Sequence, residues 1–165
     1  RWVEDRADFL GTEVQPGNLY NDEVNGELLP PRLYEEFILP VELDLGEFQG
    51  IVYWHSCGVT TDFLSLIHRI PGLEMFHVGP WTDIERAAEE MGDLALEVCL
   101  DPVGDVQRAD DGRIDERMEG ICAACGEMAF TVRADGLHTI DALDRELEAI
   151  DRWLERARDV RDRFW

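Results

Sequence analysis

Four residues of the chain, His55, Cys57, His77 and Cys99, have side chains and a spacing that favour metal chemistry. Imidazole nitrogen and thiolate sulfur are preferred ligands of zinc. One residue separates His55 from Cys57, so both side chains project to the same side of an extended segment. His77 stands midway between His55 and Cys99 in the sequence, as it would if one strand–helix repeat separated each pair. The sequence therefore predicts a zinc site.

The cysteines and histidines also have ordinary structural interpretations. A single histidine or cysteine that ends a strand is commonly a core residue, and this alternative stays open for His77 and Cys99. Cys122 and Cys125 form a CxxC pattern, which favours either a redox or second zinc site or simple helix packing. The two alanines between them favour packing.

The elements that must position these residues follow a repeating pattern. Four short apolar runs, rich in β-branched, aromatic and leucine residues, each precede a segment of helical period. The predicted strands cover residues 51–55, 73–78, 94–100 and 128–133. The predicted helices cover residues 31–43, 61–70, 82–91, 115–125 and 141–164. Alternating strands and helices require right-handed crossovers and a parallel sheet, and four such units predict half of a (β/α)8 TIM-type barrel over residues 1–165.

Three local features refine this prediction. Thr82 and Glu85 match a capping box at the start of the 82–91 helix. The acidic segment 105–115 is typical of a solvated loop. Residues 1–10 resemble the middle of a helix, which suggests that the chain is a fragment of a longer protein.

The site of a parallel barrel forms where its strands end, and several polar residues fall there. Asp22 and Glu23 would orient a substrate or carry a proton, with a solvated turn as the alternative. Arg133 would pair with a substrate carboxylate, or more simply with Asp135. His138, in the loop that follows, would reach the same rim.

The composition excludes several classes of function. Against 37 acidic residues stand 15 basic ones, all of them arginine, so the formal net charge is -22. A field of this sign repels nucleic acid and anionic membrane surfaces. The absence of lysine excludes Schiff-base and Walker-lysine chemistry. No apolar run approaches the roughly 20 residues of a membrane helix, so we expect a cytoplasmic protein without a membrane span.

Five ordered motifs resemble the uroporphyrinogen decarboxylase superfamily. They are NDEV (21–24), LPPRLYEEFILP (29–40), YWHSCG (53–58), FHVGPWTD (76–83) and CLDP (99–102). The resemblance covers nearly the whole chain and corresponds to the carboxyl-terminal half of that family's barrel. It implies that an amino-terminal half-barrel, or a second copy of the chain, completes the structure.

The resemblance is strongest to the corrinoid-dependent methyltransferases of that superfamily. It implies that the histidine and cysteine of the 55–57 motif hold zinc together with a later cysteine. This sequence has Arg-Ala-Asp at 133–135, where that cysteine is expected. Cys99 or His77, or less readily Glu97, would then supply the missing ligand.

The function expected from this resemblance is zinc-assisted methyl transfer that involves a corrinoid (cobalamin). A small molecule would donate or accept the methyl group, and a partner protein would carry the corrinoid. One alternative is a uroporphyrinogen decarboxylase, which acts on a tetrapyrrole without metal and uses rim groups such as His138. A second alternative is an inactive fragment that needs the other half-barrel.

Overall fold

The computed structural model describes residues 17–164, which form a five-stranded sheet with helical segments between the strands. The strands are β1 (Gly17–Tyr20), β2 (Ile51–His55), β3 (Met75–Val78), β4 (Ala95–Leu100) and β5 (Phe130–Ala134). The α-helices are α2 (Pro31–Leu33), α3 (Leu39–Gln49), α4 (Leu64–Ile67), α5 (Ile84–Glu90), α6 (Asp111–Cys125) and α7 (Leu143–Phe164). The remaining turns are the π-helical η1 (Tyr34–Ile38) and η3 (Pro102–Gln107) and the 3-10 turn η2 (Thr61–Phe63).

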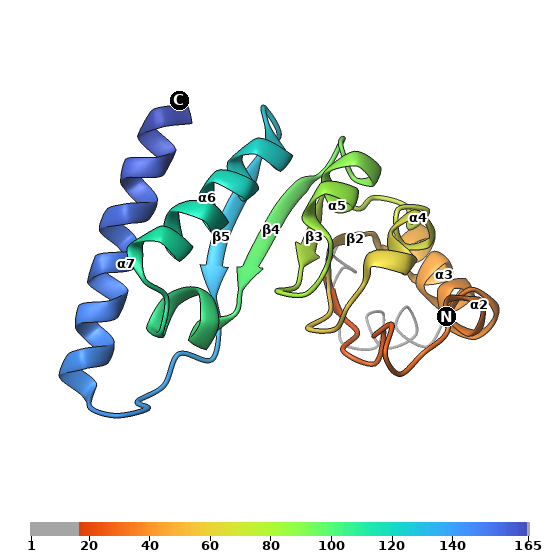
Figure 1. Cartoon of the computed structure of the whole chain (residues 1–165). Coiled ribbons are helices and arrows are strands. Elements are labelled where there is room, and N and C mark those ends of the chain that lie inside the picture. The colour runs from red at the N-terminus through yellow and green to blue at the C-terminus, as the bar shows by residue number, and fades with distance from the viewer. Residues whose placement is uncertain (1–16, 165) are drawn as a thin grey trace, which may run out of the picture.

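The sheet is parallel, and its strands lie side by side in sequence order from β1 to β5. The helices gather on one face of the sheet, and α7 lies at the outer end of this layer, packed against α6 (Figure 1). The prediction of an α/β fold with parallel strands alternating with helices is confirmed. Closure into a barrel stays a prediction.

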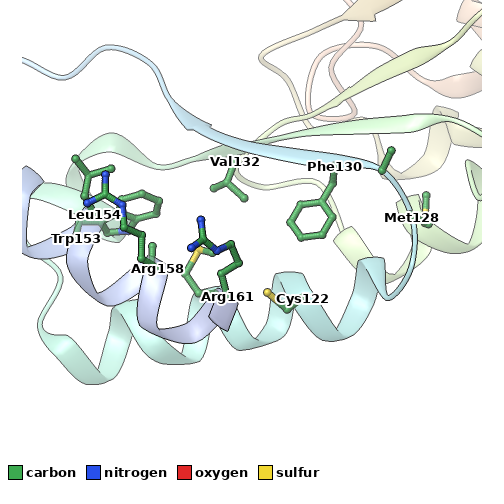
Figure 2. A pocket seen from close by; sticks show the side chains of 11 residues that line it. Cys122, Met128, Phe130, Val132, Trp153, Leu154, Arg158 and Arg161 are labelled. Carbon is green, nitrogen blue, oxygen red and sulfur yellow. The ribbon is translucent and has the colours of Figure 1, made fainter. Parts of the chain in front are cut away.

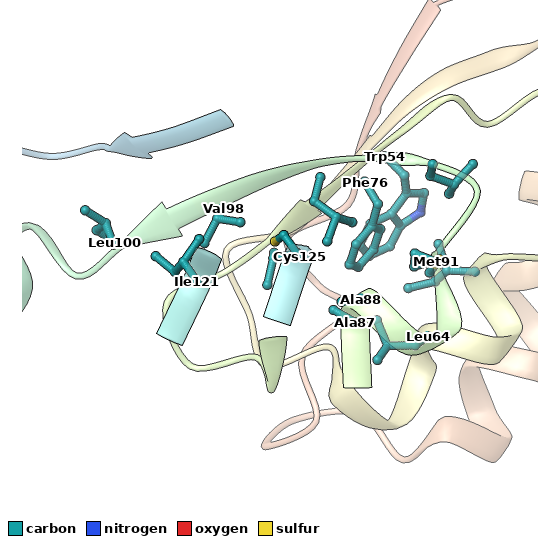
Figure 3. Close-up of a cluster of buried hydrophobic side chains, with 14 of the residues drawn as sticks. Trp54, Leu64, Phe76, Ala87, Ala88, Met91, Val98, Leu100, Ile121 and Cys125 are labelled. Atoms are coloured by element: carbon teal, nitrogen blue, oxygen red, sulfur yellow. The ribbon is translucent and has the colours of Figure 1, made fainter. Parts of the chain in front are cut away.

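The two faces of the sheet differ in chemistry because successive side chains of a strand alternate between them. On the helical face, Trp54, Phe76 and Leu96 are fully buried, and the rings of Trp54 and Phe76 stack with centroids 5.6 Å apart. Figure 3 shows these rings among apolar side chains of the covering helices. Full burial of such a side chain stabilises the fold by about 1.5–3 kcal/mol. Polar and reactive residues occupy the alternate positions of the strands, namely Asn18, Tyr20, Tyr53, His55, His77, Glu97, Cys99, Thr131 and Arg133.

The strand register then brings several of these residues together. Tyr20 lies beside His55, and His77 lies beside Glu97. The carboxyl ends of β1, β2 and β3 therefore lie together along one rim of the sheet.

The sequence analysis missed one strand and assigned the wrong cap to one helix. Strand β1 is absent from the sequence prediction, because Gly17 and Asn18 are residues that strands disfavour. The predicted capping box is wrong, because Asp83 caps α5 by accepting a hydrogen bond from the Arg86 N–H. The Thr82 hydroxyl is instead buried beside Thr60, at 3.1 Å. The other predicted strands begin one or two residues earlier than those observed, whereas 51–55 coincides with β2.

The acidic segment 105–115 is also not the predicted solvated loop. Asp105 is buried in η3, and α6 already begins at Asp111. The Asp105 carboxylate lies 2.7 Å from Arg113 Nη2 and 3.5 Å from Arg117 Nε. Pairing with arginine allows a carboxylate to be buried, which the charge pattern alone does not reveal.

No helix within residues 17–164 combines the length and the apolar character that crossing a membrane requires. The predicted helix at residues 1–10 lies outside the described residues. The cytoplasmic location stays a prediction.

Candidate metal centre

Asp22 is held at the rim by the turn that follows β1. The Asn21 N–H donates to the His55 carbonyl oxygen at 2.8 Å, and Asn21 Nδ2 donates to the Glu42 carboxylate at 2.6 Å. Glu42 is buried in α3 and also accepts a hydrogen bond from the Tyr34 hydroxyl at 2.5 Å. These contacts place Asp22 beside the carboxyl end of β2.

The loop after β2 is fixed by contacts that hold Cys57. The fully buried Ser56 hydroxyl donates to the Val24 carbonyl oxygen at 2.9 Å and accepts from the Gly58 N–H at 3.0 Å. Gly58 packs so closely against Asn25 that an added Cβ would lie 2.5 Å from the Asn25 Cβ. A side chain at position 58 would therefore displace the loop that presents Cys57.

Three donor atoms converge at this rim. His55 Nε2 lies 3.3 Å from Cys57 Sγ and 3.5 Å from Asp22 Oδ1. One ligand atom from each of the three residues lies within 4.8 Å of the other two. Ligands of a tetrahedral zinc ion, with bonds of about 2.0–2.3 Å, are about 3.3–3.8 Å apart. The separations from His55 therefore fit a shared zinc ion.

The exposure of these residues leaves one side of the site open. His55 is buried, whereas Asp22 and Cys57 are exposed. An ion here would face protein on one side and retain a position for water or substrate on the other. Desolvation by neighbouring groups, followed by the Asp22 carboxylate, raises the pKa of the Cys57 thiol. The thiol is therefore protonated at neutral pH unless a cation binds.

The Tyr53 hydroxyl connects His55 to Glu97. It donates a short hydrogen bond to Glu97 Oε2 and lies 3.1 Å from His55 Nδ1. Because the hydroxyl proton is directed at the carboxylate, its oxygen accepts the His55 Nδ1 proton. The network thus assigns His55 the tautomer whose unprotonated Nε2 faces Cys57 and Asp22. Such an outer hydrogen bond is typical of histidines that ligate metals.

The Glu97 carboxylate accepts hydrogen bonds at both of its oxygens. His77 Nδ1 lies 3.0 Å from Oε2, and Arg133 Nη1 donates to Oε1 at 2.9 Å. Burial alone would raise the pKa of this carboxyl, but the hydrogen bonds from Tyr53, His77 and Arg133 lower it to about 2. Glu97 is therefore ionised, and both of its carboxylate oxygens accept hydrogen bonds from neighbouring side chains.

A second group of possible ligand atoms comes from His55, His77 and Glu97, also within 4.8 Å of one another. The Tyr53 hydroxyl approaches all three, at 3.1 Å from His55 Nδ1 and 3.5 Å from His77 Nδ1. Hydrogen bonds through the Tyr53 hydroxyl already link these three residues, so they form a hydrogen-bond network in this structure. The group of Asp22, His55 and Cys57 is the better candidate metal centre.

One ring nitrogen of His77 has no hydrogen-bond partner within residues 17–164. The side chain is 1% exposed, and donation from Nδ1 to Glu97 leaves Nε2 as an acceptor. Nε2 is buried and has no hydrogen-bond partner in residues 17–164. Burial, the largest influence, lowers the pKa of His77, so the ring is neutral. The ring centroids of His77 and His55 are 4.0 Å apart, so this nitrogen fits a contact to a group bound near His55.

Two other predicted site residues, Cys99 and Glu23, lie outside the group of Asp22, His55 and Cys57. Cys99 is buried, and its thiol donates to the Leu100 carbonyl oxygen at 3.7 Å. Glu23 is exposed in the turn after β1. Asp22, rather than Cys99 or His77, is the third donor that the structure brings to His55 and Cys57.

Arg133 and His138 also lie outside this group. Arg133 donates a hydrogen bond to Asp135 Oδ2 at 2.6 Å and another to Glu97. The guanidinium therefore forms ion pairs with both acidic side chains. His138 is exposed, and its Nδ1 lies 2.8 Å from the Gly136 carbonyl oxygen.

Tyr53 is a residue of the candidate site that the sequence analysis did not single out. It precedes His55 by two positions in β2, so the alternation of a strand already places both side chains on one face. The signal was therefore present in the motif that contains His55 and Cys57.

The CxxC cysteines have a structural role. Cys122 and Cys125 are buried in α6 and belong to the apolar core. Burial raises the pKa of Cys125 to about 11, which disfavours the thiolate that redox or metal chemistry requires.

Comparison with models of known protein families finds no match for this sequence, and a search of curated proteins finds no relative. The geometry of Asp22, His55 and Cys57 and the motifs of the sequence are therefore what a functional proposal rests on.

Proposed function

We propose that this chain is part of a zinc-dependent methyltransferase in which Asp22, His55 and Cys57 hold the metal. The observation that supports the metal is the position of His55 Nε2, 3.3 Å from Cys57 Sγ and 3.5 Å from Asp22 Oδ1. The methyl transfer and its corrinoid carrier rest on the resemblance of the motifs to the uroporphyrinogen decarboxylase superfamily. The parallel five-stranded sheet supports the half-barrel that belongs to the same proposal.

Zinc bound at this site would lower the pKa of a substrate thiol and keep its thiolate nucleophilic. A methyl corrinoid carried by a partner protein would supply the methyl group to this thiolate, with the electron pair of the cobalt–carbon bond left on cobalt.

The residues of the chain orient the participants. Tyr53 and Glu97 hold His55 with Nε2 toward the metal position. The Cys57 N–H donates to Asp22 Oδ1 at 3.0 Å, which fixes this carboxylate beside the other two donors. His77 Nε2, which has no hydrogen-bond partner within residues 17–164, is buried close to the His55 ring rather than open to solvent.

Metal analysis tests the first half of the proposal. We expect about one zinc ion per purified chain. Cys57→Ser should lose the zinc, and Asp22→Asn should bind it more weakly. Cys122→Ser is the matched control, because Cys122 is buried in the core, and it should retain zinc. Cobalt(II) substitution gives an independent readout, since thiolate ligation produces a near-ultraviolet charge-transfer band that Cys57→Ser should lack.

An activity assay tests the second half of the proposal, the methyl transfer. Zinc-loaded protein should accelerate demethylation of methylcobalamin by a small thiol, followed by the change in corrinoid absorbance. The decarboxylase alternative instead expects loss of carbon dioxide from a tetrapyrrole, unaffected by zinc removal. The fragment alternative expects zinc binding without either reaction. A chain that binds no zinc would overturn the proposed function.

A further inference from the structure

A groove of about 550 Å³ lies on the helical side of the sheet, between β5 and the helices α6 and α7. Figure 2 shows Phe130 and Val132 pointing from β5 toward the helices. Cys122 of α6 and Trp153 and Leu154 of α7 line the opposite wall. This volume lies within the range of about 300–1,000 Å³ that is typical of small-molecule sites.

The wall of the groove differs in charge from the rest of the chain. Within residues 17–164, none of the residues that line it is acidic, although the chain contains 37 acidic residues. The charged residues of the wall are Arg158 and Arg161 of α7, and the others are apolar. In a chain of formal net charge -22, the groove is therefore a place where an anion meets attraction instead of repulsion.

The two arginines lie at the mouth of the groove. Both are exposed, and they stand one helical turn apart on the face of α7 that includes Leu154. Arg161 pairs with its exposed neighbour Asp162, whereas Arg158 forms no ion pair among the described residues. Guanidinium groups bind carboxylates through paired hydrogen bonds. The mouth therefore suits the carboxylate of a bound molecule.

The apolar part of the wall suits a flexible chain. Met118 of α6 and Met128, which precedes β5, line it together with aliphatic and aromatic side chains. Methionine side chains are unbranched and adapt to the shape of what they contact. An alkyl chain can follow such a wall while its charged end stays at the mouth.

We propose that this groove binds a medium-chain aliphatic carboxylate, with the alkyl chain between β5 and the helices and the carboxylate on Arg158 and Arg161. The site goes beyond the proposed function and does not depend on zinc, because it lies on the face of the sheet opposite to His55. It also leaves the main-chain edge of β5 free, so it does not depend on how the sheet continues.

Titration of decanoate into the isotope-labelled full chain, below the micelle concentration, tests the proposal. Decanoate should cause saturable shifts of the Phe130 and Val132 amide resonances and of the Trp153 indole resonance. Decanol has the same chain length without the charge and should bind about tenfold more weakly. Hexanoate should also bind more weakly than decanoate, because it buries less alkyl surface.

Substitution of the arginines tests the contact with the carboxylate. The double variant Arg158→Gln/Arg161→Gln should bind decanoate about tenfold more weakly and decanol as the wild type does. Arg145→Gln is the matched control, because Arg145 belongs to the same helix but does not line the groove, and it should bind decanoate normally.

A third variant tests the apolar wall. Leu154→Asp changes a partly exposed side chain, so the fold should persist by circular dichroism while the added negative charge abolishes decanoate binding. Zinc uptake should stay unchanged in every variant, which separates this proposal from the metal proposal. Absence of saturable binding, equal affinity for decanoate and decanol, or full affinity of the double variant would each overturn the proposal. So would self-association of the chain through this groove that decanoate does not disturb.

Discussion

The geometry of the candidate metal centre depends on a single oxygen atom, that of the Tyr53 hydroxyl. Tyr53→Phe removes the acceptor for the His55 Nδ1 proton and leaves His55 free to change tautomer. Loss of such an outer partner commonly lowers metal affinity by about 10–100-fold, and we expect a decrease of this size. Competition with a chelating dye measures it.

Tyr20→Phe is the matched control for this prediction. The Tyr20 ring lies 5.0 Å from the His55 ring, but its hydroxyl makes no hydrogen bond among the described residues. Its removal should leave zinc affinity unchanged. Equal affinity of the Tyr53→Phe variant and the wild type would contradict the assigned hydrogen-bond relay.

The buried ring of His77 makes the stability of the zinc-free chain sensitive to acid. Burial lowers the pKa of His77 below its ordinary value, against the opposing influence of Glu97. Below about pH 6.5 the unfolded chain therefore binds more protons than the folded chain. The stabilisation is complete above this pH and is lost as the pH falls toward the folded-state pKa. Urea unfolding at about pH 7.5 and about pH 5.5 should show a lower free energy of unfolding at the lower pH.

His77→Gln should reduce this difference between the two pH values. If His77→Gln and the wild type lose the same stability on acidification, another group is responsible.

The loop after β2 depends on the absence of a side chain at position 58. Gly58→Ala places a methyl group 2.5 Å from the Asn25 Cβ, so either the turn after β1 or the Cys57 loop must shift. We expect a loss of about 1–3 kcal/mol in stability, together with weaker zinc binding. Thermal unfolding and the dye competition measure the two effects.

Gly120→Ala gives the opposite result at a helical glycine. Gly120 lies inside α6, and an added Cβ there meets no atom within 4 Å. Alanine in a helix should raise stability by about 0.5–1 kcal/mol and leave zinc binding unchanged. A Gly58→Ala variant as stable as the wild type would show that the loop adapts at little cost.

The elements that the sequence predicted well are those with strong local signals. Residues 51–55 form a strand as predicted, because β-branched and aromatic residues dominate that run. The weak strand β1 needed its partner β2 to form, and the cap of α5 was decided by a tertiary contact of Thr82. Local patterns contain neither kind of information.

The same distinction applies to the candidate site. The pairing of His55 with Cys57 follows from their spacing in one segment. The approach of Asp22 depends on the turn that Asn21 and Glu42 hold, which joins parts of the chain distant in sequence. No spacing rule links Asp22 to His55.

The net charge of the whole chain should make its stability depend on salt. The chain of 165 residues has a formal net charge of -22. Its like charges repel one another more strongly in the compact folded chain than in the expanded unfolded chain. Salt screens this repulsion, with a Debye length of about 10 Å at 0.1 M and about 3 Å at 1 M. We expect Tm to rise by several degrees with sodium chloride, mostly at the lowest concentrations, in differential scanning calorimetry. A fall in Tm would mean that ion pairs such as Arg156 with Asp115 outweigh the repulsion.

Of the four cysteines, only Cys57 is exposed. A maleimide or spin label applied to the native chain would therefore attach at one atom, without removal of the other thiols. Because the pKa of Cys57 is raised, labelling should require mildly alkaline buffer, and a cation on the sulfur should block it. A fluorophore placed there would report directly on whatever approaches the end of β2.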